Sequence, residues 1–436
     1  MKERYHAIPR DLFGALAAGG GGPEAVGALA AAEHSKHSAL LRGVLSAAGG
    51  ADAAQARCAR LGWEVLAEVE RQDHDAAARV VSYPAVGAWA IRTLAALDAD
   101  GRTPERACAR LAEVAAAAAM RSGLDVEVPV LPVAGIVSLP SVGAARVDAD
   151  AAVLRTHAGR AEIRWAAGRV EIRADTRRDT SDWLGIRHCQ AGQLATVIED
   201  LHPFRMPAVT GLAPRLTERE AGGWVRTIQQ GWRVLATGHP AVAAEIAAAI
   251  SAIVPLSRSA HGQISSSSAE AFGAVAMSEP PDPDTCASTF IHEAQHLKLC
   301  AVLDIVSLTL PDDGRRYYAP WRTDPRPIAG LLQGAYAYLG VTEFWRRQRQ
   351  LATGAAQVRA DGDFARWRAG TARVIDTLLA SDRLTPAGTD FVERMRETAV
   401  QWQTETVSTQ AQAFARQESG SHLSRWELDN GPIPSA

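Results

Sequence analysis

The sequence predicts an α+β fold that is mainly helical, with a small antiparallel sheet and one helix that carries two histidines about one turn apart. Three observations support this prediction. Apolar residues recur at helical spacing near the N-terminus, over 23–48, 51–72, 85–98 and 103–121. Short alternating runs separated by glycine turns occupy 124–175, as in antiparallel hairpins. Helical spacing dominates again over 285–308 and from 328 to about 418.

These changes of periodicity divide the chain into three regions. Residues 1–122 are expected to form an N-terminal helical region, 123–215 a small β-rich region, and 216–436 a mainly helical region that carries a metal site and catalysis. Within the last region, 217–253 is expected to be helical and 271–277 has the length and apolar character of a strand.

The composition excludes several classes of protein. The 436 residues carry a net charge of −3, so no basic surface for nucleic acid is expected. No apolar run reaches the roughly 18 residues of a membrane span, and no apolar signal sequence follows residues 1–5. Five cysteines without CxxC spacing fit a reduced protein. We therefore expect a cytoplasmic protein that binds neither nucleic acid nor membrane.

The most informative motif is HExxH, formed by His292, Glu293 and His296 within the predicted helix 285–308. Residues four apart on a helix project from one face, about 6 Å from each other, so both imidazoles can bind one metal ion. Glu293 can then face the open coordination position and act as a catalytic base on a metal-bound water. The strand 271–277 ends shortly before this helix, which is the order found in zincins. We therefore predict a zincin-like HExxH helix.

A third ligand is harder to place. Val302 stands where the metzincin pattern requires histidine, and Asp304 lies about 12 Å along the axis from His296, too far for a straight helix. Gln333 and Glu343 both lie on the predicted helix 328–350. Glu343 would be the orthodox zinc ligand, whereas Gln333 is a polar residue in an apolar stretch and needs a buried partner. Gln333 is the preferred ligand, and Glu343 stays open as the alternative.

The loop before that helix contains three prolines, three aromatic residues and the arginines Arg322 and Arg326. Arginines on a stiff loop are suited to binding carboxylates through two parallel hydrogen bonds. The plainer interpretation is a proline-rich connector whose arginines pair with local acidic residues.

Several of these segments together resemble one family, the HExxH-motif peptide-modification proteins that accompany ribosomally made peptide natural products. The residues that carry the resemblance are 33–36, 265–275, 291–299, 319–327 and 332–337. The most specific of them is the segment that runs from Ala319 to Pro327, APWRTDPRP.

The resemblance implies an iron(II)- and 2-oxoglutarate-dependent peptide β-hydroxylase that uses O₂ to hydroxylate the Cβ of a residue in a precursor peptide. It implies that His292 and His296 bind the iron. Such an enzyme also needs a cation for the distal carboxylate of 2-oxoglutarate, and Arg322 and Arg326 are the candidates. Other peptide-maturation enzymes are possible partners.

Two further hypotheses remain beside this one. The protein can be a zinc metallopeptidase with Glu293 as general base, or a non-catalytic protein that binds the precursor peptide. For an enzyme acting on a peptide, we expect the strand 271–277 to form the edge of a sheet, where an extended peptide can pair with unpaired backbone groups. The plainer alternative is an interior strand.

Overall fold

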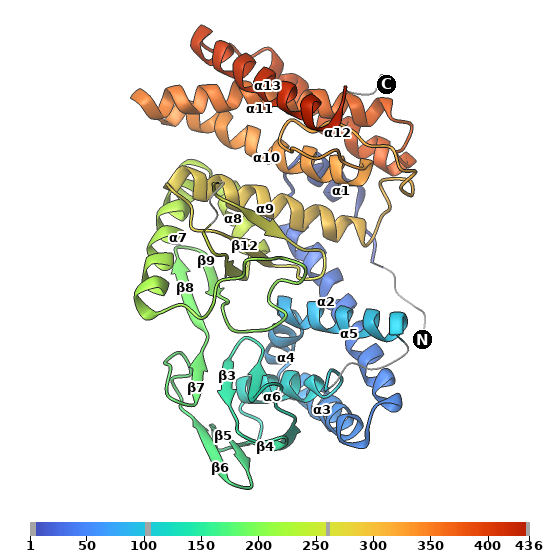
Figure 1. Ribbon diagram of the computed structural model, residues 1–436, viewed down its shortest axis with the longest axis vertical. Helices are drawn as coiled ribbons and strands as arrows, with labels where there is room; N and C mark the ends of the chain where they lie inside the picture. The colour runs from blue at the N-terminus through green and yellow to red at the C-terminus, as the bar shows by residue number, and fades with distance from the viewer. Residues whose placement is uncertain (1–5, 101–105, 259–261, 433–436) are drawn as a thin grey trace.

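The computed structural model describes residues 6–100, 106–258 and 262–432 and confirms the predicted α+β class (Figure 1). Residues 1–5 and the start of the predicted helix 103–121 lie outside the described ranges. In Figure 1 the C-terminal helices α10–α13 lie at the top, a mixed sheet and the helices α7–α9 in the middle, and two antiparallel sheets with α3 and α6 at the bottom. No single described helix is long and apolar enough to cross a membrane; the bent pair α4–α5 reaches that length only when its two helices are taken together.

The N-terminal region is helical, as expected, although the short helices α1 and α4 were not predicted. Its elements are α1 (Arg10–Ala17), α2 (Gly22–Ala47), the 3₁₀ turn Ala48–Gly50, α3 (Ala53–Gln72), α4 (His74–Val81), α5 (Pro84–Asp100) and α6 (Arg110–Ser122). The alanine run of α6 is fully buried. A Cβ on Gly62 of α3 would lie 2.8 Å from the backbone of Ala112, so the small residues allow α3 and α6 to pack closely.

The β-rich region forms two small antiparallel sheets. One has the strand order β1-β4-β5-β6 and the other β2-β3-β7. The strands are β1 (Val126–Val130), β2 (Ile136–Leu139), β3 (Gly143–Arg146), β4 (Ala152–His157), β5 (Arg160–Trp165), β6 (Gly168–Ile172) and β7 (Trp183–Gly185). The predicted hairpins over 151–173 are therefore confirmed.

A third, mixed sheet joins the β-rich region to the C-terminal region, with the order β11-β12-β10-β9-β8. Its strands are β8 (Arg187–Ala191), β9 (Leu194–Ile198), β10 (Ala252–Pro255), β11 (Ser265–Ser267) and β12 (Ala274–Met277). Residues 252 and 253, expected to be helical, lie in β10, whose four residues are all buried. The strand within 271–277 exists, but its predicted position at a sheet edge is wrong: β12 pairs with β10 on one side and with β11 on the other.

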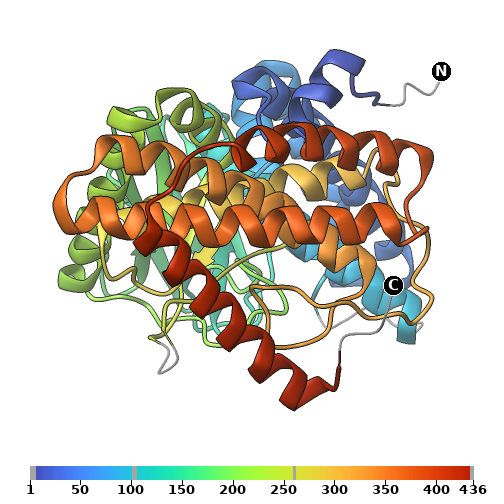
Figure 2. The ribbon, with the colours of Figure 1, turned by 90° about the horizontal axis from the view of Figure 1, so that it is seen from above.

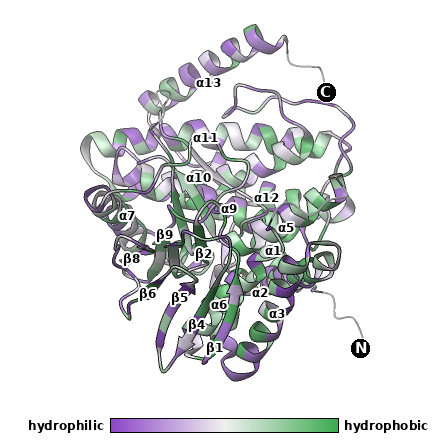
Figure 3. Cartoon of the chain, turned by 60° about the horizontal axis from the view of Figure 1, so that its bottom comes forward, coloured by the Kyte–Doolittle hydropathy of each residue, from purple (hydrophilic) through white to green (hydrophobic). Residues whose placement is uncertain are grey.

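The remaining helices cover this sheet and build the upper part of the molecule. They are α7 (Glu218–Gly238), α8 (Pro240–Ala249), α9 (Pro283–Leu303), α10 (Ile328–Leu351), α11 (Gly354–Ala380), α12 (Pro386–Gln403) and α13 (Thr409–Asn430). Seen from above, α13 runs obliquely across the other C-terminal helices (Figure 2). It stands at the periphery with polar and apolar residues mixed along it (Figure 3), and it buries only Ala411, Ala415 and Trp426.

Two hydrophobic cores hold the molecule together, and neither follows the expected region boundaries. The upper core joins Leu16–Leu29 of the N-terminal helices to α7–α12 and to one face of the mixed sheet. The lower core joins α3–α6 to the antiparallel sheets and to the other face of the mixed sheet. Helix α9 belongs to the upper core, so the HExxH motif is set in a rigid, densely packed environment.

Candidate functional site

The HExxH motif lies in the middle of α9, as predicted. The helix begins after Asp282, whose carboxylate accepts a hydrogen bond from the backbone N–H of Thr285, with Pro283 in the first turn. Between 286 and 302 every residue of α9 is buried except Ser288, His292, His296 and Cys300. These four residues are spaced four apart, so one narrow stripe of the helix is partly open to solvent and both histidines lie on it.

The two imidazoles converge on one point. Nε2 of His292 lies 3.1 Å from Nε2 of His296, and the ring planes are nearly perpendicular, at 79°. Burial lowers the pKa of His292 well below its usual range, and the neighbouring His296 adds to the shift. A neutral imidazole has a free lone pair, which is the form that binds a metal ion.

Gln333 lies on α10 against the other nitrogen of His296. Its Oε1 is 2.9 Å from Nδ1 of His296, and its Nε2 contacts Sγ of Cys300 at 3.5 Å. Because an amide oxygen only accepts hydrogen bonds, Nδ1 carries the proton and Nε2 of a neutral His296 carries the lone pair. Gln333 was expected to be the third ligand; it lies instead on the side of the ring opposite Nε2, where it orients His296.

Glu293 is almost fully buried, with only 1% of its side chain exposed. Its Oε1 accepts a hydrogen bond of 2.6 Å from the hydroxyl of Ser265 in β11 and lies 4.0 Å from Nε2 of His292. Its Oε2 is buried and has no hydrogen-bond partner within the described part of the chain. Burying an unpaired carboxylate oxygen destabilises the fold unless a further group binds there. Glu293 therefore offers an oxygen that can bind a metal ion or a water beside the histidine pair.

The sequence analysis missed one residue of this site, Tyr338 of α10. Its ring packs edge-on against His292, with centroids 5.3 Å apart and an interplanar angle of 84°. Burial raises the pKa of Tyr338 to about 12. The spacing gave no signal for it, because residues five apart on a helix, such as Gln333 and Tyr338, do not share a face.

The arginine loop lies beside this aromatic residue, because Trp321 stacks on Tyr338 at 4.5 Å. Backbone hydrogen bonds in both directions between Tyr317 and Arg326 close the loop. Nε of Arg322 lies 2.8 Å from one oxygen of Asp324, and Nη1 of Arg326 lies 3.0 Å from the other. The arginines therefore pair with a local acid, as the plainer interpretation expected, while remaining partly exposed.

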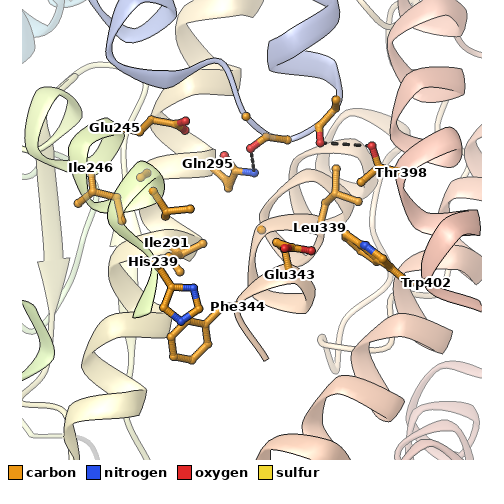
Figure 4. Close-up of a pocket in the computed structure, with 16 residues that line it drawn as sticks. His239, Glu245, Ile246, Ile291, Gln295, Leu339, Glu343, Phe344, Thr398 and Trp402 are labelled. Carbon is orange, nitrogen blue, oxygen red and sulfur yellow. Dashed lines mark hydrogen bonds between the residues drawn. The ribbon is translucent and has the colours of Figure 1, made fainter. Parts of the chain in front are cut away.

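Glu343, the alternative third ligand, lies elsewhere. It lines a cavity of about 230 Å³ with Gln295, on a side of α9 that carries neither histidine (Figure 4). Its carboxylate pairs with Arg346 at 3.1 Å, and burial raises its pKa. The structure therefore does not bring Glu343 together with His292 and His296.

The donors at this site fit a metal ion held by two imidazoles. The fit rests on the convergent Nε2 atoms, the tautomer that Gln333 imposes and the unpaired oxygen of Glu293. Over residues 6–100, 106–258 and 262–432, no group of three His, Cys, Asp or Glu side chains is arranged to hold a metal. A scan against protein-family models and a search of curated proteins both give no match for this sequence.

Proposed function

We propose that this protein is a non-haem iron, 2-oxoglutarate-dependent peptide β-hydroxylase that acts on a ribosomally made precursor peptide. The observation that carries the proposal is the pair of Nε2 atoms of His292 and His296, 3.1 Å apart on the open stripe of α9. The resemblance of the surrounding segments to the HExxH peptide-modification family supplies the choice of reaction. When bound, iron with 2-oxoglutarate and O₂ would supply the oxidant that converts a Cβ–H bond into Cβ–OH.

The residues of the chain have separate tasks in this proposal. His292 and His296 hold the metal, and Gln333 keeps the proton of His296 on Nδ1. Arg322 or Arg326 binds the distal carboxylate of 2-oxoglutarate, which takes over part of the pairing now made by Asp324. Glu293 and Ser265 present a hydrogen-bonded polar wall on the β11 side of the histidines.

The substrate peptide is proposed to pair with the outer edge of β11. Ser278 N donates to Ile264 O at 2.9 Å, so Ile264 and Ser266 are the residues whose backbone groups face β12. The backbone N–H and C=O groups of Ser265 and Ser267 point outward. No hydrogen bond joins these outward groups to another described backbone group. The hydroxyl of Ser266 donates to the carbonyl oxygen of Ser267 at 3.3 Å. An extended peptide pairing there would run beside Glu293.

An anaerobic titration tests the proposal without a known peptide. Fe(II)-loaded protein should develop a metal-to-ligand charge-transfer band on addition of 2-oxoglutarate, and His292→Ala should lose both the iron and the band. Admission of O₂ should convert 2-oxoglutarate into succinate and CO₂, and a peptide substrate should gain one oxygen atom. Wild-type protein that binds Fe(II) but shows neither the band nor succinate would contradict the proposal.

One observation favours a second candidate, a zinc metallopeptidase. Glu293 is buried next to His292 with one carboxylate oxygen unpaired, as a general base for a metal-bound water must be. In that case zinc-loaded protein should cleave peptides without 2-oxoglutarate, and Glu293→Gln should abolish cleavage. Peptide binding with neither activity would instead indicate a non-catalytic peptide-binding protein.

A further inference from the structure

An aromatic stack connects the arginine loop to the metal-binding helix. Gly334 leaves the space for it, since a Cβ at this position would lie 2.4 Å from Nε1 of Trp321. The indole therefore packs directly on α10 and stacks one turn further along on Tyr338, with an interplanar angle of 14°. Trp367 of α11 packs on Tyr338 as well, at 4.5 Å. Tyr338 is thus held by two tryptophans while its ring contacts His292.

The hydroxyl of Tyr338 is the one part of this side chain that has no defined contact. No hydrogen bond joins it to another described residue, although the side chain as a whole is only partly exposed. Arg366 of α11 is the charged neighbour that acts most strongly on Tyr338, and Glu293 and Arg322 act on it more weakly. Arg322 directly follows Trp321 in the chain, so the stack of Trp321 on Tyr338 brings the start of the arginine loop next to the ring that contacts His292.

We propose that the Tyr338 hydroxyl donates a hydrogen bond to the distal carboxylate of 2-oxoglutarate, next to the guanidinium of Arg322. This inference rests on the proposed function and adds a co-substrate-binding residue to it. A phenol keeps its proton at neutral pH and is a directional donor. The stack on Trp321 and Trp367 fixes its direction, so little side-chain entropy is lost when the carboxylate binds. The edge contact with His292 keeps the hydroxyl at a constant distance from the metal position.

The test compares two 2-oxo acids that differ in the distal carboxylate. Binding of 2-oxoglutarate and of pyruvate to anaerobic Fe(II)-loaded protein is followed by the charge-transfer band, so that no turnover is needed. Tyr338→Phe should raise the dissociation constant of 2-oxoglutarate about tenfold and leave that of pyruvate unchanged. Tyr318→Phe is the matched control, because the Tyr318 hydroxyl pairs with His422, at 2.9 Å, and its loss should change neither constant.

The other outcomes separate the two proposals. Unchanged 2-oxoglutarate binding in Tyr338→Phe, with normal binding by the wild type, overturns the role of Tyr338 and leaves the proposed function standing. An equal loss for pyruvate and 2-oxoglutarate also overturns it, because the effect would then pass through the metal site. If wild-type protein binds neither acid, the proposed function fails and this inference fails with it. The absorption spectrum of the Co(II)-loaded variant reports separately whether the metal site is intact.

Discussion

Replacing Gln333 by leucine tests how the chain prepares His296 for metal binding. Without Gln333, His296 of the metal-free protein could carry its proton on either ring nitrogen. A metal ion on Nε2 forces the proton onto Nδ1, where Gln333 Oε1 accepts it at 2.9 Å. In Gln333→Leu the Nδ1–H group loses this partner, and the cost falls mainly on the metal-bound state. An unpaired buried donor costs about 1–3 kcal/mol, so metal affinity should fall roughly 5- to 150-fold.

The assay is a competitive titration of Co(II) against a chelator, read by the visible absorption of the bound ion. Gln295→Leu is the matched control, because it removes another buried amide from this neighbourhood that bonds to the carbonyl oxygen of Gly19 and not to a histidine. It should lower the free energy of unfolding without changing metal affinity. Gln333→Glu keeps an acceptor with a negative charge and should raise metal affinity.

Two results would contradict this account. Unchanged Co(II) affinity in Gln333→Leu would mean that the hydrogen bond to His296 is irrelevant to binding. A change in the positions and intensity of the Co(II) bands would mean that Gln333 is itself a ligand, the role that the sequence analysis preferred. An orienting residue changes the affinity and leaves the ligand set, and therefore the spectrum, as it was.

Three further predictions follow from the fold and the proposed substrate edge. Ser267→Pro removes an outward N–H of β11 but no hydrogen bond to β12. Affinity for a peptide selected on the wild-type protein should therefore fall in Ser267→Pro and be retained in Ser267→Ala. Equal affinities of the two variants would exclude this edge as the peptide-binding site. Lys298→Met leaves Glu245 buried with only the backbone N–H of Gly22 and no cation beside it, and should lower the free energy of unfolding by about 3–5 kcal/mol. The double variant Lys298→Met/Glu245→Gln should recover part of this loss, as measured by urea unfolding. Burial lowers the pKa of His202 to about 3. Below about pH 6.5 this histidine is therefore protonated in the unfolded chain and still neutral in the folded chain. Stability should fall as the pH drops from 6.5 towards 3, at about 1.4 kcal/mol per pH unit for this site, and His202→Asn should reduce the slope.

The helices around the site could be predicted closely because their signals are local. For α9 the signals are the capping Asp282 and Pro283 in the first turn, and for α10 the signal is its long apolar periodicity. These signals lie in the helices or directly next to them. The mixed sheet could not be predicted in the same way. β10 has only four residues, ends in Pro255 and follows α8 after two residues. Its strand conformation depends on parallel partners in β9 and β12, which are distant in sequence. The place of β12 inside the sheet depends on the three serines of β11 in the same way.

The site shows the same division between local and distant information. Convergence of His292 and His296 follows from helix geometry alone, so their placement on one face was predictable. The partners of these histidines come from α10 and β11, and their contacts depend on the packing of α9 between those elements. Sequence spacing identified Gln333 as a polar residue in an apolar segment, but only the packing shows which nitrogen of His296 it meets.

The stack of Trp321 on Tyr338 helps to weigh the two enzyme hypotheses. Glu293 is placed as the general base of a peptidase would be, but a hydroxylase can hold the same buried carboxylate beside its metal, so Glu293 excludes neither. They differ in the need for a second anchor at a fixed distance from the metal, because only a 2-oxo acid with a distal carboxylate must be held at both ends. The stack couples the arginine loop to His292 through rigid rings, which is the kind of connection such an anchor requires. Coupling of this kind has no evident use in peptide hydrolysis, and we therefore rank the hydroxylase first.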